Sequence, residues 1–163
     1  MNLYPTSVPV LQHYIKQLAN LLTKIPPKQE AELLRKSIAP DMRPLWQQVL
    51  ITLGFALRAT APLAGLATPQ LDFQVKNLAQ LQQDIEYTQA FLAQLTAAQF
   101  DHAPDRIEHQ AGNATHSMSG EVYLHQYALP NFFFHLTCVY AILRQQGIAL
   151  SKGDFDGFHQ YPS

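Results

Sequence analysis

The chain has 163 residues, of which 47% are hydrophobic and 14% charged, and its formal net charge is −1. This length and apolar content suit one domain with a full core, so we expect a single domain over residues 1–163. The near-zero net charge excludes strong electrostatic attraction to nucleic acid or to an anionic membrane, and neither is expected as a partner.

The opening sequence, MNLYPTSVPVLQHY, has neither the basic region nor the long apolar core of a signal peptide. No apolar run reaches the ~18 residues that a membrane span requires. The single cysteine, Cys138, lies within an apolar run, which indicates a buried, reduced thiol. We therefore expect a cytoplasmic protein.

The first helix is predicted to begin near Val8 and to end at the sequence IPPK, residues 25–28. Apolar residues recur there at steps of three and four, which is the spacing of one helical face. Thr6 or Ser7 can cap its start. A short helical piece is expected to follow over residues 28–37.

A second helix is predicted from Asp41, its expected N-cap, to the breaking sequence TAPLAG at 60–65. It is apolar nearly all round between Leu45 and Leu57, which is typical of a helix buried on several sides. A third helix is expected over about residues 72–97, with one apolar stripe and one polar face.

The segment before the last helix lacks a helical period. The sequences RIEHQ and THSMS flank the turn-forming AGNA, so a small β-hairpin is predicted between residues 106 and 119. Ser119 is the expected cap of the last helix, Gly147 is its expected end, and Pro130 should kink or divide it. The tail carries Phe155, Phe158 and Tyr161, and at least its first part should pack on the body. Four long helices with one longer crossover predict an all-α four-helix bundle.

The candidate site lies on the second and last helices. Asn131 and His135 are four residues apart and share a face of the last helix, while Gln48 lies near the start of the second helix. If these helices are neighbours, the three side chains converge on one pocket that suits a small polar molecule. Amide oxygens bind transition metals weakly, so this set is poor for a metal. The competing interpretation is a core histidine at position 135 that bonds Gln48 or a backbone carbonyl and only stabilises the bundle.

Two further functions stay open from the sequence. The first is a metal-dependent transferase or hydrolase, in which His125 and His135 hold a zinc, nickel or iron ion with Asp41 or water completing the shell. It requires Pro130 to bend the helix, and no HxxxH or HExxH motif supports it. The second is a non-catalytic scaffold or stress-associated protein. A homodimer is expected in either case, because the second helix has more apolar surface than one small bundle needs to cover.

Three stretches resemble a bacterial family of unknown function within the DinB/YfiT-like superfamily of four-helix bundles. They are YPTSVPVLQHYIKQL, APDMRPLWQQV and SGEVYLHQYALPNFFFHLTCVYAILRQQGIALSKGDF, and PNFFFH…YAILRQQG is the most specific block. The resemblance implies an up-down-down-up bundle, often dimeric, with a pocket between helices.

The typical superfamily site is a metal held by three histidines, one on the second helix and two on the last. By that resemblance, His135 occupies the final histidine position, and Asn131 and Gln48 occupy the other two. Two of the three ligands are therefore amides here, which implies a remodelled pocket in place of the superfamily's metal and its thiol-transferase or hydrolase-like activities.

Overall fold

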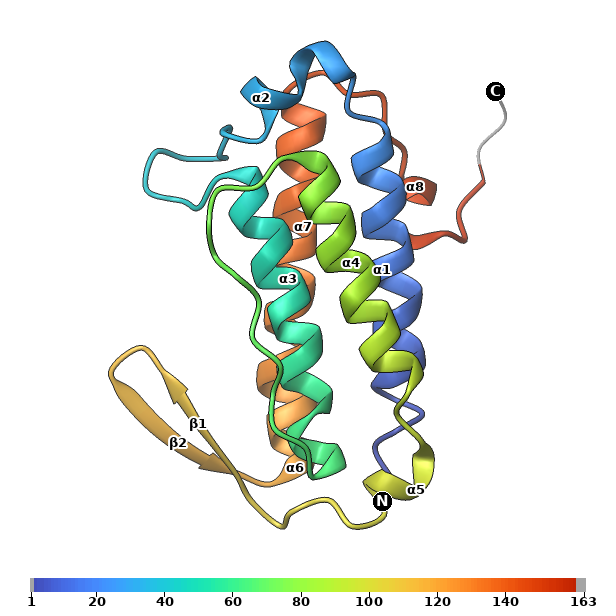
Figure 1. Cartoon of the computed structure of the whole chain (residues 1–163), viewed down its shortest axis with the longest axis vertical. Coiled ribbons are helices and arrows are strands. Elements are labelled where there is room, and N and C mark those ends of the chain that lie inside the picture. The colour runs from blue at the N-terminus through green and yellow to red at the C-terminus, as the bar shows by residue number, and fades with distance from the viewer. Residues whose placement is uncertain (1, 161–163) are drawn as a thin grey trace.

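Four long helices form the body of the molecule in a computed structural model that describes residues 2–160. They are α1 (Val8–Thr23), α3 (Leu45–Thr60), α4 (Leu78–Ala93) and α7 (Leu129–Gln145). In Figure 1, α1 and α7 run upward while α3 and α4 run downward, which is the expected up-down-down-up arrangement. The all-α bundle with a hairpin before the last helix is thus confirmed. Within the described residues, no helix is long and apolar enough to cross a membrane.

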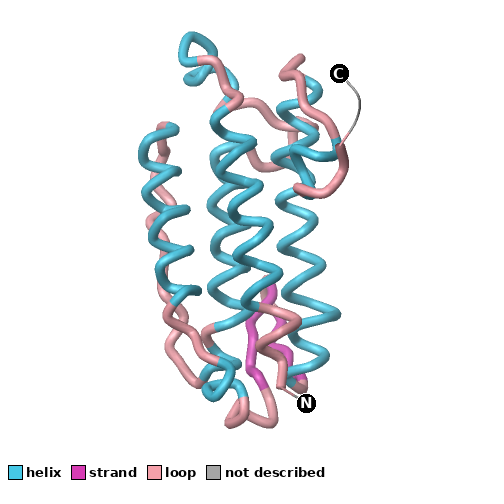
Figure 2. Tube along the Cα trace, turned by 90° about the vertical axis from the view of Figure 1, so that its right-hand side faces the viewer, coloured by secondary structure: helices cyan, strands magenta, loops and turns pink. Residues whose placement is uncertain are grey.

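Shorter elements connect and cover these helices, and Figure 2 shows them at the two ends of the bundle. They are the 3₁₀ turns Pro27–Gln29 and Pro62–Ala64, the helices α2 (Glu30–Leu33), α5 (Ala97–Phe100), α6 (Gly120–Val122) and α8 (Lys152–Asp156), and the strands β1 (Ile107–Ala111) and β2 (Ala114–Met118).

The predicted start of α3 was wrong by one turn. Asp41 is exposed, in a turn closed by the Met42 N–H and the Ala39 carbonyl, and Pro44 is the residue that precedes the helix. The proline fixes an extended backbone there and then leads into the first turn at Leu45. Asp41 is therefore not the cap of α3.

The start of α4 was also predicted too early. Asn77 and Gln80 form a reciprocal capping box, which begins the helix at Leu78 rather than near residue 72. Residues 66–77 instead form a long loop that runs alongside α3 from one end of the bundle to the other (Figure 1). This loop covers one face of α3.

α3 is the most buried helix of the bundle. It packs mainly on α7 and also on α4, and the 66–77 loop passes over it. The apolar surface that the sequence assigned to a dimer contact is therefore covered within one chain. The argument for a dimer from α3 was wrong, although the dimer itself stays a prediction.

The hairpin leads into one long helical run from Gly120 to Gln145. The Ser119 hydroxyl accepts the Val122 N–H at 3.4 Å, as expected of a cap. Pro130 does not divide the run. A π-helical segment, Tyr123–Ala128, precedes Pro130. Its wider turn lets the helix continue past the proline, which has no backbone N–H to donate.

The last helix ends as predicted. Gly147 adopts a φ of +83°, and its N–H donates to the Arg144 carbonyl while the next N–H, of Ile148, donates to Leu143. This is the Schellman motif, which favours glycine because it requires the left-handed region.

The segment after α7 packs back on α1 and α7. Phe155 contacts Tyr14 of α1 and Tyr140 of α7, while Tyr14 also contacts Phe133, so four aromatic rings fill the seam between the two helices. The tail was predicted to do this, although Tyr161 lies outside the described residues.

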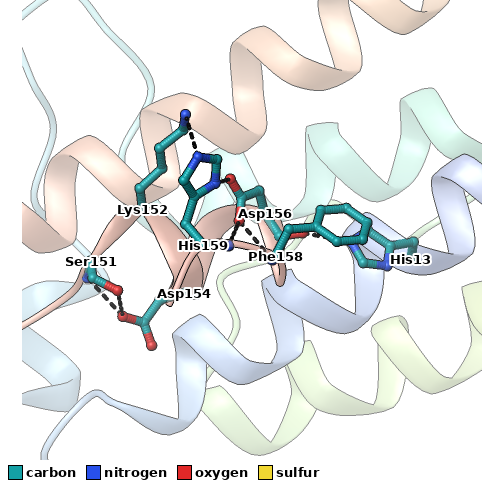
Figure 3. Close-up of polar contacts among 7 residues, drawn as sticks. All are labelled: His13, Ser151, Lys152, Asp154, Asp156, Phe158 and His159. Carbon is teal, nitrogen blue, oxygen red and sulfur yellow. Dashed lines mark hydrogen bonds and ion pairs between the residues drawn. The ribbon is translucent and has the colours of Figure 1, made fainter. Parts of the chain in front are cut away.

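A polar clasp fixes this segment to α1 (Figure 3). The His13 ring donates to the Asp156 carbonyl at 2.7 Å and stacks on Phe158. The Asp156 carboxylate accepts the backbone N–H groups of Phe158 and His159 and the His159 ring, and these contacts lower its pKa to about 2. Its bonds are directed to the clasp itself, so we assign it a structural role.

Candidate functional site

Gln48 and His135 meet between α3 and α7. The Gln48 Oε1 atom and the His135 Nδ1 atom are 2.7 Å apart, although the residues are far apart in the chain. The contact forms because α3 and α7 are neighbours, as the sequence argument required. Two of the three expected site residues are thus in direct contact.

The hydrogen bonds of Gln48 determine the tautomer of His135. The Gln48 amide nitrogen donates to the Arg43 carbonyl at 3.1 Å, so its oxygen faces the imidazole. An amide oxygen only accepts, and therefore Nδ1 carries the ring proton. The other nitrogen of His135, Nε2, is left as a hydrogen-bond acceptor.

His135 is held neutral by its surroundings. Its ring is half-buried and stacks on Phe55, with centroids 5.6 Å apart. Burial, followed by the nearby positive charge of Arg58, lowers the pKa of His135 to about 4. The imidazole is therefore an uncharged acceptor at neutral pH and a weak base.

Asn131 lies one turn before His135 but makes a different contact. Its amide nitrogen donates to the Tyr127 carbonyl of its own helix at 2.8 Å. Within residues 2–160 the Asn131 Oδ1 atom makes no hydrogen bond, so it offers a second acceptor on the same face as His135. The structure does not join Asn131 to Gln48.

His125 does not share a site with His135. Its Nε2 atom lies 3.3 Å from the Thr6 hydroxyl, just before α1. Ten residues of helix separate the two histidines, which corresponds to roughly 15 Å along the axis. The predicted ion bridge between them is therefore wrong in this geometry.

The residues at the site do not fit a bound transition metal. Gln48 uses its oxygen for His135, and Asn131 supplies only a weak amide oxygen, so a single good ligand atom, His135 Nε2, is left. Structural and catalytic zinc sites use at least three protein ligands. No group of three or more His, Cys, Asp or Glu side chains in the described part of the chain could hold a metal ion.

An aromatic and cationic cluster, which was not predicted from the sequence, adjoins His135. Phe55 contacts Tyr127, and the Tyr127 hydroxyl group lies 2.7 Å from the Nε2 atom of the hairpin residue His109, within hydrogen-bonding distance. Tyr123 donates to the backbone carbonyl of Arg58 at 2.9 Å, and burial raises the pKa of Tyr123 to about 12.

A signal for this cluster exists in the sequence. Tyr123, Tyr127, Asn131 and His135 follow one another at steps of four, which is the spacing of one helical face. The hairpin residue His109 could not be placed this way, because its position depends on how the hairpin folds onto the helix.

A family model described as "Domain of unknown function (DUF1993)" matches residues 3–156. The crystal structure of a DinB family member protein from Shewanella denitrificans is similar over 99% of this chain and 95% of that chain, with 27% identity and a TM-score of 0.84. No curated protein matches the sequence. The fold is therefore DinB-like, and the chain belongs to the DUF1993 family.

Proposed function

We propose that this protein binds a small, neutral polar ligand at the face formed by Asn131 and His135. The main support for this proposal is the hydrogen bond from His135 to Gln48, because it leaves a neutral imidazole with Nε2 as an acceptor. The Asn131 oxygen, one turn away, is a second acceptor. The ligand must therefore supply donors, as hydroxyl or amide N–H groups do.

The charge of Arg58 narrows the ligand class further. Its positive charge is close enough to lower the pKa of His135, so a cationic amine is disfavoured at the same place. Neutral hydroxyl-bearing or amide-bearing molecules satisfy both acceptors without that repulsion. A metal-dependent activity is not supported, since the residues offer one strong ligand atom only.

A thermal-shift screen of neutral polyols and small amides tests this proposal. A ligand at a hundred times its dissociation constant should stabilise the wild-type protein by about 2.7 kcal/mol. The H135N variant should lose most of that stabilisation because it lacks the Nε2 acceptor. The H125N variant is the matched control, since its histidine lies on the same helical run but contacts Thr6, and it should keep the stabilisation.

Two results would contradict the proposal. One is a ligand that stabilises H135N as strongly as the wild type. The other is stoichiometric zinc, nickel or iron in protein purified without a histidine tag, which would restore the metal-dependent alternative.

The outer face of α7 supports a second proposal, a homodimer. Phe134 is 54% exposed, and it lines an apolar groove of about 310 Å³ together with Ile38, Phe133, Thr137, Cys138 and Ala141. Among residues 2–160, no charged side chain lines this groove, so two copies can approach without like-charge repulsion. A specific dimer of this kind buries about 1,600 Å² in total.

Light scattering at micromolar concentration tests the dimer. The wild-type mass should be twice the 18.4 kDa of one chain. Replacing the exposed Thr137 with glutamate should shift the mass to one chain, because it places a charge in the apolar groove. Gln126 is also exposed on the same helical run, so the control variant Gln126→Glu should leave the dimer intact. A wild-type mass near 18.4 kDa would refute the dimer.

A further inference from the structure

Arg58 lies in the last turn of α3 and is held in place by its own helix. Its Nε atom donates to the Gly54 carbonyl at 3.1 Å, and its guanidinium carbon lies 4.1 Å from the centre of the Phe55 ring. These contacts fix the plane of the guanidinium group. The hydrogen bond to Gly54 uses the Nε atom, so it does not occupy the two terminal nitrogens.

The guanidinium group has no anionic partner within residues 2–160. Among the residues that the structure describes, no carboxylate forms an ion pair with Arg58, and neither terminal nitrogen makes a hydrogen bond. The side chain is nevertheless half-buried, and desolvation lowers its pKa from the usual value. A partly buried cation of this kind is normally paired, so the missing partner points to a ligand.

A small cavity lies where such a ligand would sit. It measures about 100 Å³ and is lined by Gly54 and Arg58 of α3, by residues 68–71 and by Phe73. Residues 68–73 belong to the loop that runs along α3 in Figure 1. In the described part of the chain, no acidic side chain lines the cavity. The adjacent Asp72 is directed to Lys76, at 4.0 Å.

We propose that this cavity binds the carboxylate or phosphate group of a small molecule through the terminal nitrogens of Arg58. A guanidinium fork matches the two oxygens of either group, and its end-on edge is the one available because Nε is already used. The cavity has room for one such group. Thr68 and Gln70 of the loop also line the cavity, and the Gln70 amide nitrogen donates to the Thr68 carbonyl at 3.1 Å. The Thr68 hydroxyl can add a neutral hydrogen bond to a bound anion.

Gly54 lines the cavity together with Arg58, one turn away on the same helix. A Cβ atom at this position would lie 3.4 Å from the Arg58 Nη2 atom, which is ordinary contact, so alanine fits without a clash but occupies the space beside the fork. Glycine in a helix interior is less favourable than alanine. The Gly54→Ala variant should therefore be at least as stable as the wild type and yet bind the anion less well.

Titration of inorganic phosphate and of acetate, followed by NMR chemical shifts at constant ionic strength, tests the site. We expect saturable shifts around residues 54–58 and 68–73 with at least one of the two anions. Affinity should fall at least tenfold in R58Q and in G54A, and R58K should also be weaker because lysine keeps the charge but loses the fork. The anion that saturates tells whether the ligand carries a phosphate or a carboxylate.

Two controls separate this site from its neighbours. R144Q removes an equal charge from an exposed position on α7 and should bind like the wild type. H135N should also bind the anion, so loss of the proposed neutral-ligand site and loss of the anion site are distinguishable. Bound anion should raise the pKa of His135 toward its usual value, because it offsets the charge of Arg58. Absence of saturation by both anions, undiminished binding in R58Q and G54A, or an equal loss in R144Q would overturn the proposal.

Discussion

Replacing Gln48 with leucine is expected to lower the free energy of unfolding by about 1–3 kcal/mol. Leucine has a similar volume, but it leaves the Nδ1–H group of His135 and the carbonyl of Arg43 without their partner. Gln48 is only 1% exposed, so water cannot replace both bonds. Urea denaturation of the two proteins measures the difference.

Gln47→Leu is the matched control for this prediction. Gln47 is the adjacent residue and is half-buried, but within residues 2–160 its side chain makes no hydrogen bond. Its replacement should change stability by less than about 0.5 kcal/mol. An equal loss in both variants would mean that the bond to His135 contributes nothing specific.

The second large effect is a loss of stability between about pH 6.5 and pH 4. The folded-state pKa of His135 is lowered to about 4, whereas the unfolded chain titrates near 6.5. Below pH 6.5 the unfolded state takes up a proton that the folded state does not, so stability falls as the pH falls and the loss is complete near pH 4. The shift corresponds to about 3 kcal/mol in full, and solvent screening of this half-buried ring reduces the expected loss to about 1–2 kcal/mol.

Urea midpoints measured across this pH range, for the wild type and for H135N, test the effect. The variant should show a flatter profile, because asparagine does not titrate. Burial also lowers the pKa of His109, so the stability of the variant should still depend on pH to some extent. The stabilising contribution of Asp156 is lost at lower pH, near 2. Identical profiles for the two proteins would show that His135 is not the group responsible.

The bundle could be predicted because its apolar residues recur at helical spacing, and the contact between Gln48 and His135 followed from the same reasoning. Both residues lie on the faces along which α3 and α7 pack. Spacing within each helix, together with the assumption that these helices are neighbours, was enough to bring them together.

The errors came from segments whose path is set by tertiary contacts. The stretch before Leu78 has enough apolar residues to suggest a helix, but its role is to cover α3 as a loop. The site at Arg58 could not be predicted for the same reason, because the cavity beside it is formed only when this loop packs against α3. Its sequence position suggested only a cation near a helix end.

The aromatic seam between α1 and α7 has a consequence for synthesis of the chain. Tyr14 is synthesised long before its ring partners, Phe133 and Phe155, because both lie far later in the chain. Closing such long separations is slow compared with forming a helix. One side of α1 therefore stays uncovered until both aromatic partners have been synthesised, and the nascent chain exposes this apolar surface in the meantime.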